Sequence, residues 1–244
     1  MKNFADLRIL LLQIRDDEET MLEEYLEFVE LSGLHEQQFT VLNTFRTPEF
    51  SPDCVLDYDA LFVGGSSDAS VLKPELYPFV HNCRGLIRYC YEHDIPVLAS
   101  CFGFQLLTVE FGGTIILDEA NQEMGLYEIT LNDDAMRDPL LNDMPRTFYA
   151  VSGHRERAIK LPNIVTPYAS SKLCEHHMFK ANDKPIYGFQ FHPEVTTKDL
   201  ISRISRYRDR YLKNAEELQA VLDGATFETP ESNGLIRKFV ERVL

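Results

Sequence analysis

Three short stretches of this sequence carry residue types that could together perform nucleophilic chemistry. In the first, Cys101 follows the apolar run Pro96 to Ala99 and precedes a helix-like stretch that opens at Phe102. A strained strand-to-helix turn lifts a thiol away from the backbone, and the free N–H groups at the start of the helix favour the thiolate. Cys101 is therefore either a buried core residue or a nucleophile aimed out of a sheet.

The second stretch could supply hydrogen-bond donors for a developing negative charge. Gly64 and Gly65 come at the end of an apolar strand-like run that starts at Asp59. Glycine lets backbone N–H groups approach a ligand closely, so this loop could provide half of an oxyanion hole. The N–H of Phe102 could provide the other half. The alternative is an ordinary glycine turn.

The third stretch could supply a base. His192 and Glu194 flank Pro193 just after another apolar run. A cysteine nucleophile needs a base, and the base needs an acceptor that orients it. His192 can act as the base while Glu194 accepts from its other ring nitrogen, and Pro193 stiffens the link. Taken alone, a histidine in this position is more often an ordinary residue at a strand end.

Together, the three stretches resemble the class I glutamine amidotransferase family. The matching segments are Gly64 to Ser66, Ser100 to Gln105 and Gln190 to Glu194, and the resemblance covers roughly residues 7–195. It implies that Cys101 attacks the side-chain amide of glutamine, forms a γ-glutamyl thioester and releases ammonia. His192 would carry the proton and Glu194 would orient it.

The resemblance also implies roles for neighbouring residues. The backbone N–H groups of Gly65 and Phe102 would form the oxyanion hole. Substrate-binding positions carried over from the family are Gly64, Gln105, Ser152 and His154. The last two lie in Ser152-Gly153-His154, which looks like the family's Ser-His segment with one residue inserted. No cofactor is implied.

Two positions depart from the family pattern. Ala99 stands where the family usually has glycine, and Phe104 stands where it usually has histidine. Ala99 is small, so the turn should survive unless its φ is positive. Phe104 occupies a position that we expect to face the pocket or a partner surface. The change from histidine should therefore influence the choice of substrate or the coupling to a partner.

The order of apolar segments indicates an α/β fold that would position these residues. Strand-like runs at 7–14, 38–45, 59–65 and 96–99 alternate with helix-like stretches at 18–33, 74–94 and from 102 onward. This rhythm predicts a three-layer sandwich with a central, mostly parallel sheet. Ligands bind at the carboxyl ends of such strands, where Gly65 and Cys101 lie.

The remainder of the chain has a different texture. Short strand-like segments joined by turns between Thr114 and Phe191 predict an antiparallel extension of the sheet. Residues 199–221 have a helical pattern, 224–234 form a linker, and 235–244 form a last short helix. We expect a single domain over residues 1–244, with a core at about 7–195 and a C-terminal helical segment at 196–244.

Composition excludes several classes of protein. The net charge of −15 argues against nucleic acid as a partner, because phosphate binding needs clustered Lys and Arg. No apolar run is long enough for a membrane span, and the N-terminus lacks the pattern of a signal peptide. The five cysteines are odd in number and irregularly spaced, which favours free thiols in the cytoplasm. The acidic segment Asp16 to Glu30 is typical of a solvated helix face.

No metal site is predicted. Cys174-Glu175-His176-His177 contains suitable ligands, but no second ligand cluster follows at matching spacing. No phosphate-binding loop of the GxxxxGK[ST] type occurs, so ATP binding is not indicated.

Three functions remain open at this stage. The first is a glutaminase whose ammonia acceptor lies on a separate synthase subunit, because the family pattern fills most of the chain. The second is a standalone hydrolase of γ-glutamyl peptides, which would form the same thioester. The third is a non-catalytic regulatory protein that retains the fold. An unrelated redox cysteine is disfavoured, since such a residue needs no His-Pro-Glu element.

Overall fold

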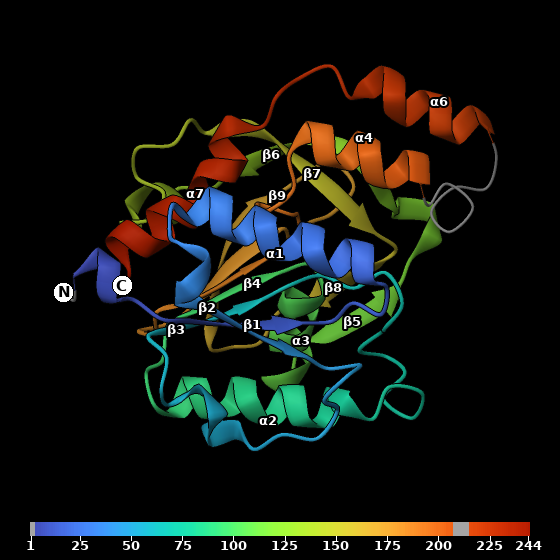
Figure 1. Ribbon diagram of the computed structural model, residues 1–244. Helices are drawn as coiled ribbons and strands as arrows, with labels where there is room; N and C mark the ends of the chain where they lie inside the picture. The colour runs from blue at the N-terminus through green and yellow to red at the C-terminus, as the bar shows by residue number, and fades with distance from the viewer. Residues whose placement is uncertain (1–2, 207–214) are drawn as a thin grey trace.

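The computed structural model describes residues 3–206 and 215–244 (Figure 1). Its central sheet has nine strands in the order β2-β1-β3-β4-β11-β10-β9-β6-β7. The parallel half consists of β1 (Ile9–Gln13), β2 (Phe39–Asn43), β3 (Ala60–Val63), β4 (Val97–Ser100) and β11 (Ile186–Phe189). All residues of β1, β3 and β4 are buried, as expected for parallel strands covered on both faces.

The predicted antiparallel extension is confirmed. It consists of β6 (Glu123–Leu131), β7 (Thr147–His154), β9 (Val165–Ser170) and β10 (Met178–Ala181). A separate two-stranded ribbon pairs β5 (Thr114–Leu117) with β8 (Glu156–Lys160). Strands β8 and β10 also lie within the stretch from Thr114 to Phe191 where short strands are expected.

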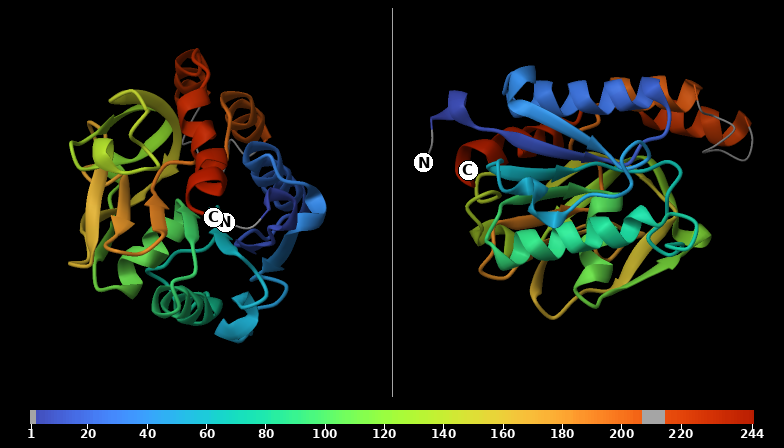
Figure 2. Two further views of the ribbon diagram at one scale, coloured as in Figure 1. Left: turned by 90° about the vertical axis from the view of Figure 1, so that its left-hand side faces the viewer. Right: turned by 60° about the horizontal axis from the view of Figure 1, so that its bottom comes forward.

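Helices cover both faces of the sheet, which confirms the three-layer sandwich (Figures 1 and 2). On one face lie α1 (Glu18–Ser32), α4 (Thr197–Arg206), α6 (Ala215–Gly224) and α7 (Pro230–Arg242). On the other face lie α2 (Phe79–Glu92) and α3 (Phe102–Glu110). Short 3₁₀ turns occur at Phe4–Asp6, Glu36–Gln38, Pro52–Val55, Glu119–Asn121 and Ala135–Arg137.

Two predicted helix starts are wrong. The helix expected from Pro74 begins only at Phe79, because Pro78 has no N–H and cannot continue a helix from the preceding turn. The last helix, expected from Leu235, begins instead at Pro230, where a proline in the first turn costs no hydrogen bond. Part of the helix expected at 199–221, residues 207–214, lies outside the described residues.

The sheet separates two hydrophobic cores. Beneath α1 and α7, Phe62 packs edge-on against Phe239, with ring centroids 5.8 Å apart. Beneath α2 and α3 the core includes Cys83 and Cys90, both fully buried. No helix among residues 3–206 and 215–244 is long and apolar enough to cross a membrane.

The acidic segment departs from its predicted role. Helix α1 begins at the N-cap Asp17, whose side chain accepts from the N–H of Thr20, and ends at Gly33 with φ of 72°. Within it, however, Glu24 is fully buried and Glu27 is 8% exposed. The expectation of a wholly solvated face is therefore wrong, because α1 turns these two acids toward the end of the sheet that carries the active-site candidates.

Candidate active site

Cys101 lies on the turn between β4 and α3 with φ of 45° and ψ of −96°. A positive φ is uncommon for a residue with a Cβ, and such strain is concentrated at functional sites. The turn is tight, because a Cβ built on Gly103 would lie 2.9 Å from the Cβ atoms of Ala99 and Val63. Ala99 keeps a negative φ within β4, so the departure from glycine is tolerated there.

Strand pairing brings the two predicted catalytic segments together. β11 runs parallel to β4 with Phe189 opposite Ser100, so both chains leave the sheet at the same edge. The N–H of Cys101 donates to the carbonyl of Phe189 at 2.7 Å. The N–H of His192 donates to the carbonyl of Val151 at 2.8 Å, which ties the histidine to β7.

His192 lies between a thiol and a carboxylate. Its Nδ1 is 2.7 Å from Oε1 of Glu194, and its ring is also hydrogen-bonded to Cys101. Burial alone would lower the pKa of His192, but the charges of Glu194 and of the Cys101 thiolate outweigh it and raise that pKa to about 10. The same charge on His192 lowers the pKa of Glu194 despite its burial. This is the geometry of a nucleophile, a base and an orienting acid in series.

The glycine loop lies directly against this dyad. A Cβ on Gly65 would be 2.8 Å from Cε1 of His192 and 3.0 Å from Nη2 of Arg15, so only glycine fits. Phe102 is the first residue of α3, and the N–H groups of a first helical turn have no partner within the helix. The two positions predicted to hold an oxyanion therefore lie beside His192 and next to Cys101 respectively.

Cys101 opens onto a cleft of about 410 Å³. The walls come from the loop Ser66–Lys73, the first turn of α3 and the segment Gly153–Glu156. Nε2 of Gln105 donates to the carbonyl of Glu156 at 2.9 Å, which joins two of these walls. The cleft lies within the range of pocket sizes usual for small-molecule sites.

Comparison with known proteins identifies the family. Residues 36–206 match the family described as "Glutamine amidotransferase class-I". The match spans more than half of the chain and contains both Cys101 and Glu194.

This chain belongs to the class-I glutamine amidotransferase family.

Curated relatives of this amidotransferase include proteins named as subunits of a glutamine-hydrolysing GMP synthase. The relative from Methanocaldococcus jannaschii is 30% identical over 137 residues, which are 56% of this chain and 67% of that protein. The relative from Methanothermobacter thermautotrophicus is 30% identical over 118 residues, 48% of this chain and 61% of that protein. The matched part of the chain therefore spans 61% to 67% of the length of these two relatives.

Solved structures share the fold of this amidotransferase over nearly its whole length. A glutamine amidotransferase of Thermotoga maritima has a TM-score of 0.79 at 23% identity, with 97% of each chain covered. A glutamine amidotransferase of Methylobacillus flagellatus has a TM-score of 0.69 at 17% identity, with 96% of this chain and 91% of that chain covered.

The other predicted site residues of this amidotransferase lie in three different settings. The N–H of Gly64 donates to Leu12 at 3.1 Å, and a Cβ there would be 2.5 Å from a carboxylate oxygen of Glu24, so Gly64 faces α1. Ser152 is fully buried and borders a second cavity. His154 borders the main cleft, but Nε2 of its ring lies 3.1 Å from Glu123.

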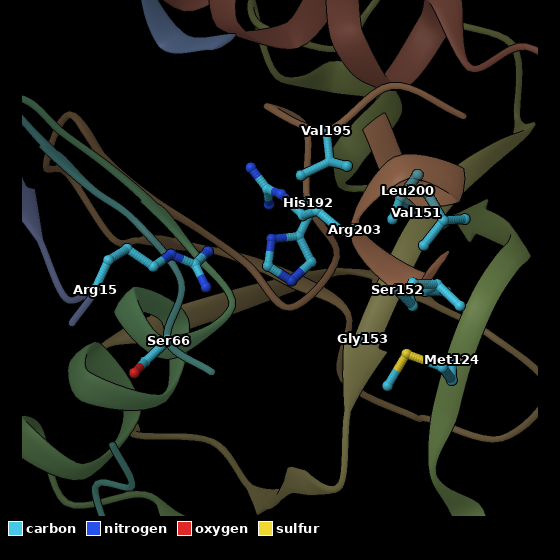
Figure 3. Close-up of a pocket in the computed structure, with 11 residues that line it drawn as sticks. Arg15, Ser66, Met124, Val151, Ser152, Gly153, His192, Val195, Leu200 and Arg203 are labelled. Atoms are coloured by element: carbon cyan, nitrogen blue, oxygen red, sulfur yellow. The ribbon is translucent and has the colours of Figure 1, made fainter. Parts of the chain in front are cut away.

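The second cavity, of about 50 Å³, adjoins the cleft at Ser66 and Gly153 (Figure 3). It runs past His192 toward α4, where Val195 and Leu200 make its wall apolar. His192 thus lines this small, mostly apolar cavity, whereas Cys101 lines the larger cleft.

Two residues at the site belong to the motifs but have no role predicted from the sequence. Oγ of Ser100 donates to Oε1 of Glu194 at 3.0 Å, which helps to fix the carboxylate. Nε2 of Gln190 lies 3.8 Å from Sγ of Cys101, and Oε1 of Gln190 accepts from Gln105 at 3.5 Å. The sequence gives one indication of these roles, because Ser100 directly precedes Cys101 and Gln190 lies two residues before His192.

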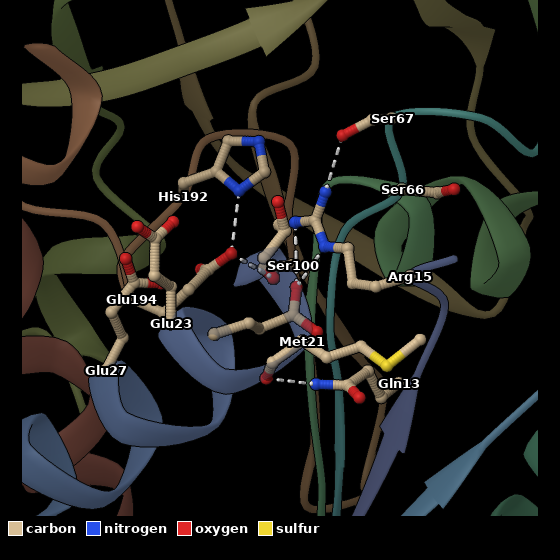
Figure 4. Close-up of polar contacts among 12 residues, drawn as sticks. Gln13, Arg15, Met21, Glu23, Glu27, Ser66, Ser67, Ser100, His192 and Glu194 are labelled. Carbon is tan, nitrogen blue, oxygen red and sulfur yellow. Dashed lines mark hydrogen bonds and ion pairs between the residues drawn. The ribbon is translucent and has the colours of Figure 1, made fainter. Parts of the chain in front are cut away.

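A buried charge network behind the dyad also escapes sequence reasoning (Figure 4). Nη2 of Arg15 lies 2.7 Å from Oε2 of Glu24, and Nη1 donates to Oγ of Ser67 at 2.9 Å. Nη2 of Arg203 lies 2.6 Å from Oε2 of Glu27. No local sequence pattern indicates these contacts, because the partners come from the loops after β1 and β3 and from α1 and α4.

Proposed function

We propose that this protein hydrolyses the side-chain amide of glutamine through a γ-glutamyl thioester on Cys101. The observation that carries the proposal is the buried series from Cys101 through His192 to Glu194 at the edge of the cleft. Because the raised pKa of His192 keeps the imidazole protonated at neutral pH, the ring can both stabilise a thiolate and donate a proton.

The reaction follows from this arrangement. The Cys101 thiolate attacks the amide carbon, and the N–H groups of Gly65 and Phe102 hold the resulting oxyanion. His192 donates its proton to the amide nitrogen, so the carbon–nitrogen bond breaks and ammonia leaves. Water then attacks the thioester carbon while His192 accepts its proton, which releases glutamate and restores the thiolate. Glu194 keeps Nδ1 of His192 hydrogen-bonded throughout.

We infer that the ammonia acceptor lies on a separate polypeptide. The support is that two relatives are each named as one subunit of a glutamine-hydrolysing GMP synthase, so that glutamine hydrolysis there belongs to a synthase of more than one chain. We also place the protein in the cytoplasm, because all five of its cysteines are free thiols.

A second candidate is hydrolysis of γ-glutamyl peptides, and the cleft favours it. A volume of about 410 Å³ has room for more than one amino acid. Lys73 and Arg155 line this cleft and carry positive charges that could attract the carboxylate of an additional residue.

The test compares ammonia release from glutamine with cleavage of γ-glutamyl dipeptides by the same preparation. We expect ammonia release that is abolished in Cys101→Ala and retained in Cys54→Ala, since Cys54 does not line the cleft. Faster cleavage of dipeptides than of glutamine would favour the second candidate. Activity that persists in Cys101→Ala would exclude the thioester for both.

Thiol labelling at neutral pH distinguishes an enzyme from the non-catalytic alternative. A glutamine-like electrophile should modify Cys101 much faster than the other four cysteines, three of which are fully buried or nearly so. Equal, slow labelling of all five would support a regulatory protein that retains only the fold.

A further inference from the structure

Four buried side chains with metal-binding atoms meet beside the catalytic cleft. Glu123 and His154 come from β6 and β7, while Cys174 and His177 come from the loop between β9 and β10. One donor atom each from His154, Cys174 and His177 lie within 4.8 Å of one another. None of the four residues is more than 4% exposed.

The Glu123 carboxylate accounts for one ring nitrogen of each histidine but not for the other. Nε2 of His177 pairs with Oε2 of Glu123 at 2.7 Å, whereas Nδ1 of the same ring is buried without a partner. His154 donates from Nε2 to the Glu123 carboxylate at 3.1 Å and leaves its own Nδ1 buried without a partner. Buried polar atoms are almost always partnered, so the Nδ1 atoms of His154 and His177 are available to a further ligand.

We propose that His154, Cys174 and His177 bind a single Zn²⁺ ion, with Glu123 holding the second ring nitrogen of His154. Two imidazole nitrogens and one thiolate are a donor set that zinc prefers. A carboxylate behind a zinc-bound histidine is the usual orienting partner. Ligand atoms around tetrahedral zinc lie about 3.5 Å apart, so zinc binding needs at most a small closing of the donor atoms, which already lie within 4.8 Å of one another.

The charges balance in this site. The thiolate of Cys174 and the carboxylate of Glu123 together offset the two positive charges of the ion, which permits its burial. The ion would fasten the end of β7 to the β9–β10 loop. Because Gly153 to Glu156 form one wall of the cleft, the site would stiffen that wall without taking part in the reaction at Cys101.

The test measures metal stoichiometry in the Cys101→Ser protein, so that the nucleophile cannot act as a ligand. After treatment with a chelator and dialysis, the protein is titrated with Zn²⁺ and, separately, with Co²⁺. We expect one equivalent of tightly bound zinc by elemental analysis. Co²⁺ should give a thiolate charge-transfer band together with the visible absorption of tetrahedral cobalt.

Variants identify the ligands. Cys174→Ser and His177→Gln, each in the Cys101→Ser background, should weaken zinc binding by more than about 100-fold, since even orienting partners of ligands contribute about 10- to 100-fold. Cys54→Ser is the matched control and should bind normally. Zinc should raise the Tm of the parent protein but not of the Cys174→Ser variant.

Two results would overturn the zinc site. One is the absence of a thiolate–cobalt band in the folded parent protein, a readout that needs no ligand variant. The other is full zinc binding by a folded Cys174→Ser variant. Neither result depends on glutaminase activity, so the zinc site and the proposed reaction are tested independently.

Discussion

The histidine at position 192 combines two opposing influences on its protonation. Burial disfavours the charged ring, whereas Glu194 and the Cys101 thiolate favour it, and the charges prevail. A protonated imidazole with one nitrogen held by a carboxylate is prepared to deliver a proton to the leaving amide nitrogen. The catalytic role that we propose for Glu194 is therefore testable through the protonation of His192.

Glu194→Gln should lower kcat by about 10²- to 10⁴-fold, in keeping with loss of the acid that orients a catalytic histidine. It removes the largest charge that raises the pKa of His192, so that pKa falls. Activity that requires protonated His192 is present below that pKa and is lost as pH rises through it. The alkaline limb of the kcat profile, near pH 10 in the wild type, should therefore move to lower pH in the variant.

The measurement is ammonia release between about pH 6 and pH 10.5 at saturating glutamine, a range that brackets the alkaline limb. Ser100→Ala, which removes the hydrogen bond to Oε1 of Glu194 but not the charge, is the comparison variant. It should shift the limb less. An unchanged limb in Glu194→Gln would mean that the carboxylate does not control the protonation of His192.

Gly103→Ala should disrupt the turn that presents Cys101. The new Cβ would lie 2.9 Å from the Cβ atoms of Ala99 and Val63, which are both fully buried, so overpacking should cost about 1 to 3 kcal/mol. The free energy of unfolding in urea and the rate of Cys101 alkylation should both fall. Gly234→Ala in α7 is the control, because a Cβ there meets nothing within 4 Å.

At the scale of elements, α1 does more than cover the sheet. It delivers Glu24 and Glu27 to two arginines, Arg15 and Arg203, behind the catalytic dyad. A buried ion pair is weak evidence for stability as a whole, but removing one member leaves an uncompensated charge. Helix α1 therefore fixes the charge balance on which the nearby Glu194 depends.

Glu24→Ala should destabilise the protein by about 3 to 5 kcal/mol, because it leaves the Arg15 guanidinium buried without its carboxylate. Glu18→Ala removes an acid of the same helix whose partner, Arg46, is largely exposed. That control should leave the free energy of unfolding almost unchanged. Urea titration of both variants measures their free energies of unfolding. Equal losses in the two variants would show that the buried Glu24 pair stabilises the protein no more than the exposed Glu18 pair does.

At the scale of the whole molecule, the C-terminal helix α7 supports the backbone of the candidate active site. Nδ2 of Asn233, in α7, donates to the carbonyl of Pro193 at 2.8 Å and to that of Val195 at 3.0 Å. Phe239 of the same helix packs against Phe62 in β3. A segment that follows the catalytic motif in the chain therefore returns to hold the backbone of the His-Pro-Glu turn.

Asn233→Ala should cost about 1 to 3 kcal/mol of stability, because two buried carbonyls lose their donor. It should also lower kcat, since the backbone that carries His192 and Glu194 is no longer held. Phe227→Ala, at a residue that is 54% exposed, is the control for general disturbance of the C-terminal segment. A stable Asn233→Ala protein with unchanged kcat would show that α7 covers the sheet but does not support the site.

Local features of this protein are readable from the sequence. The apolar runs and their alternation with helical spacing predict the parallel half of the sheet, since periodicity reports which faces are buried. The turn at Cys101 and the pairing of His192 with Glu194, two residues apart, can also be predicted from the sequence, because both depend on neighbouring residues. The replacement of glycine by Ala99 is also explained locally. The φ of Ala99 is negative, so alanine can form the turn there as well as glycine.

Only the tertiary structure decided which distant residues meet. The pairing of β11 with β4 places His192 beside Cys101, and the folding of β6, β7 and the β9–β10 loop gathers Glu123, His154, Cys174 and His177. It also buries Glu24 and Glu27, which a charge pattern assigns to solvent. The physical reason is that the spacing of residues along one segment shows only which face of that segment is buried. The residues that this face contacts depend on strand order and helix placement, which the spacing does not encode.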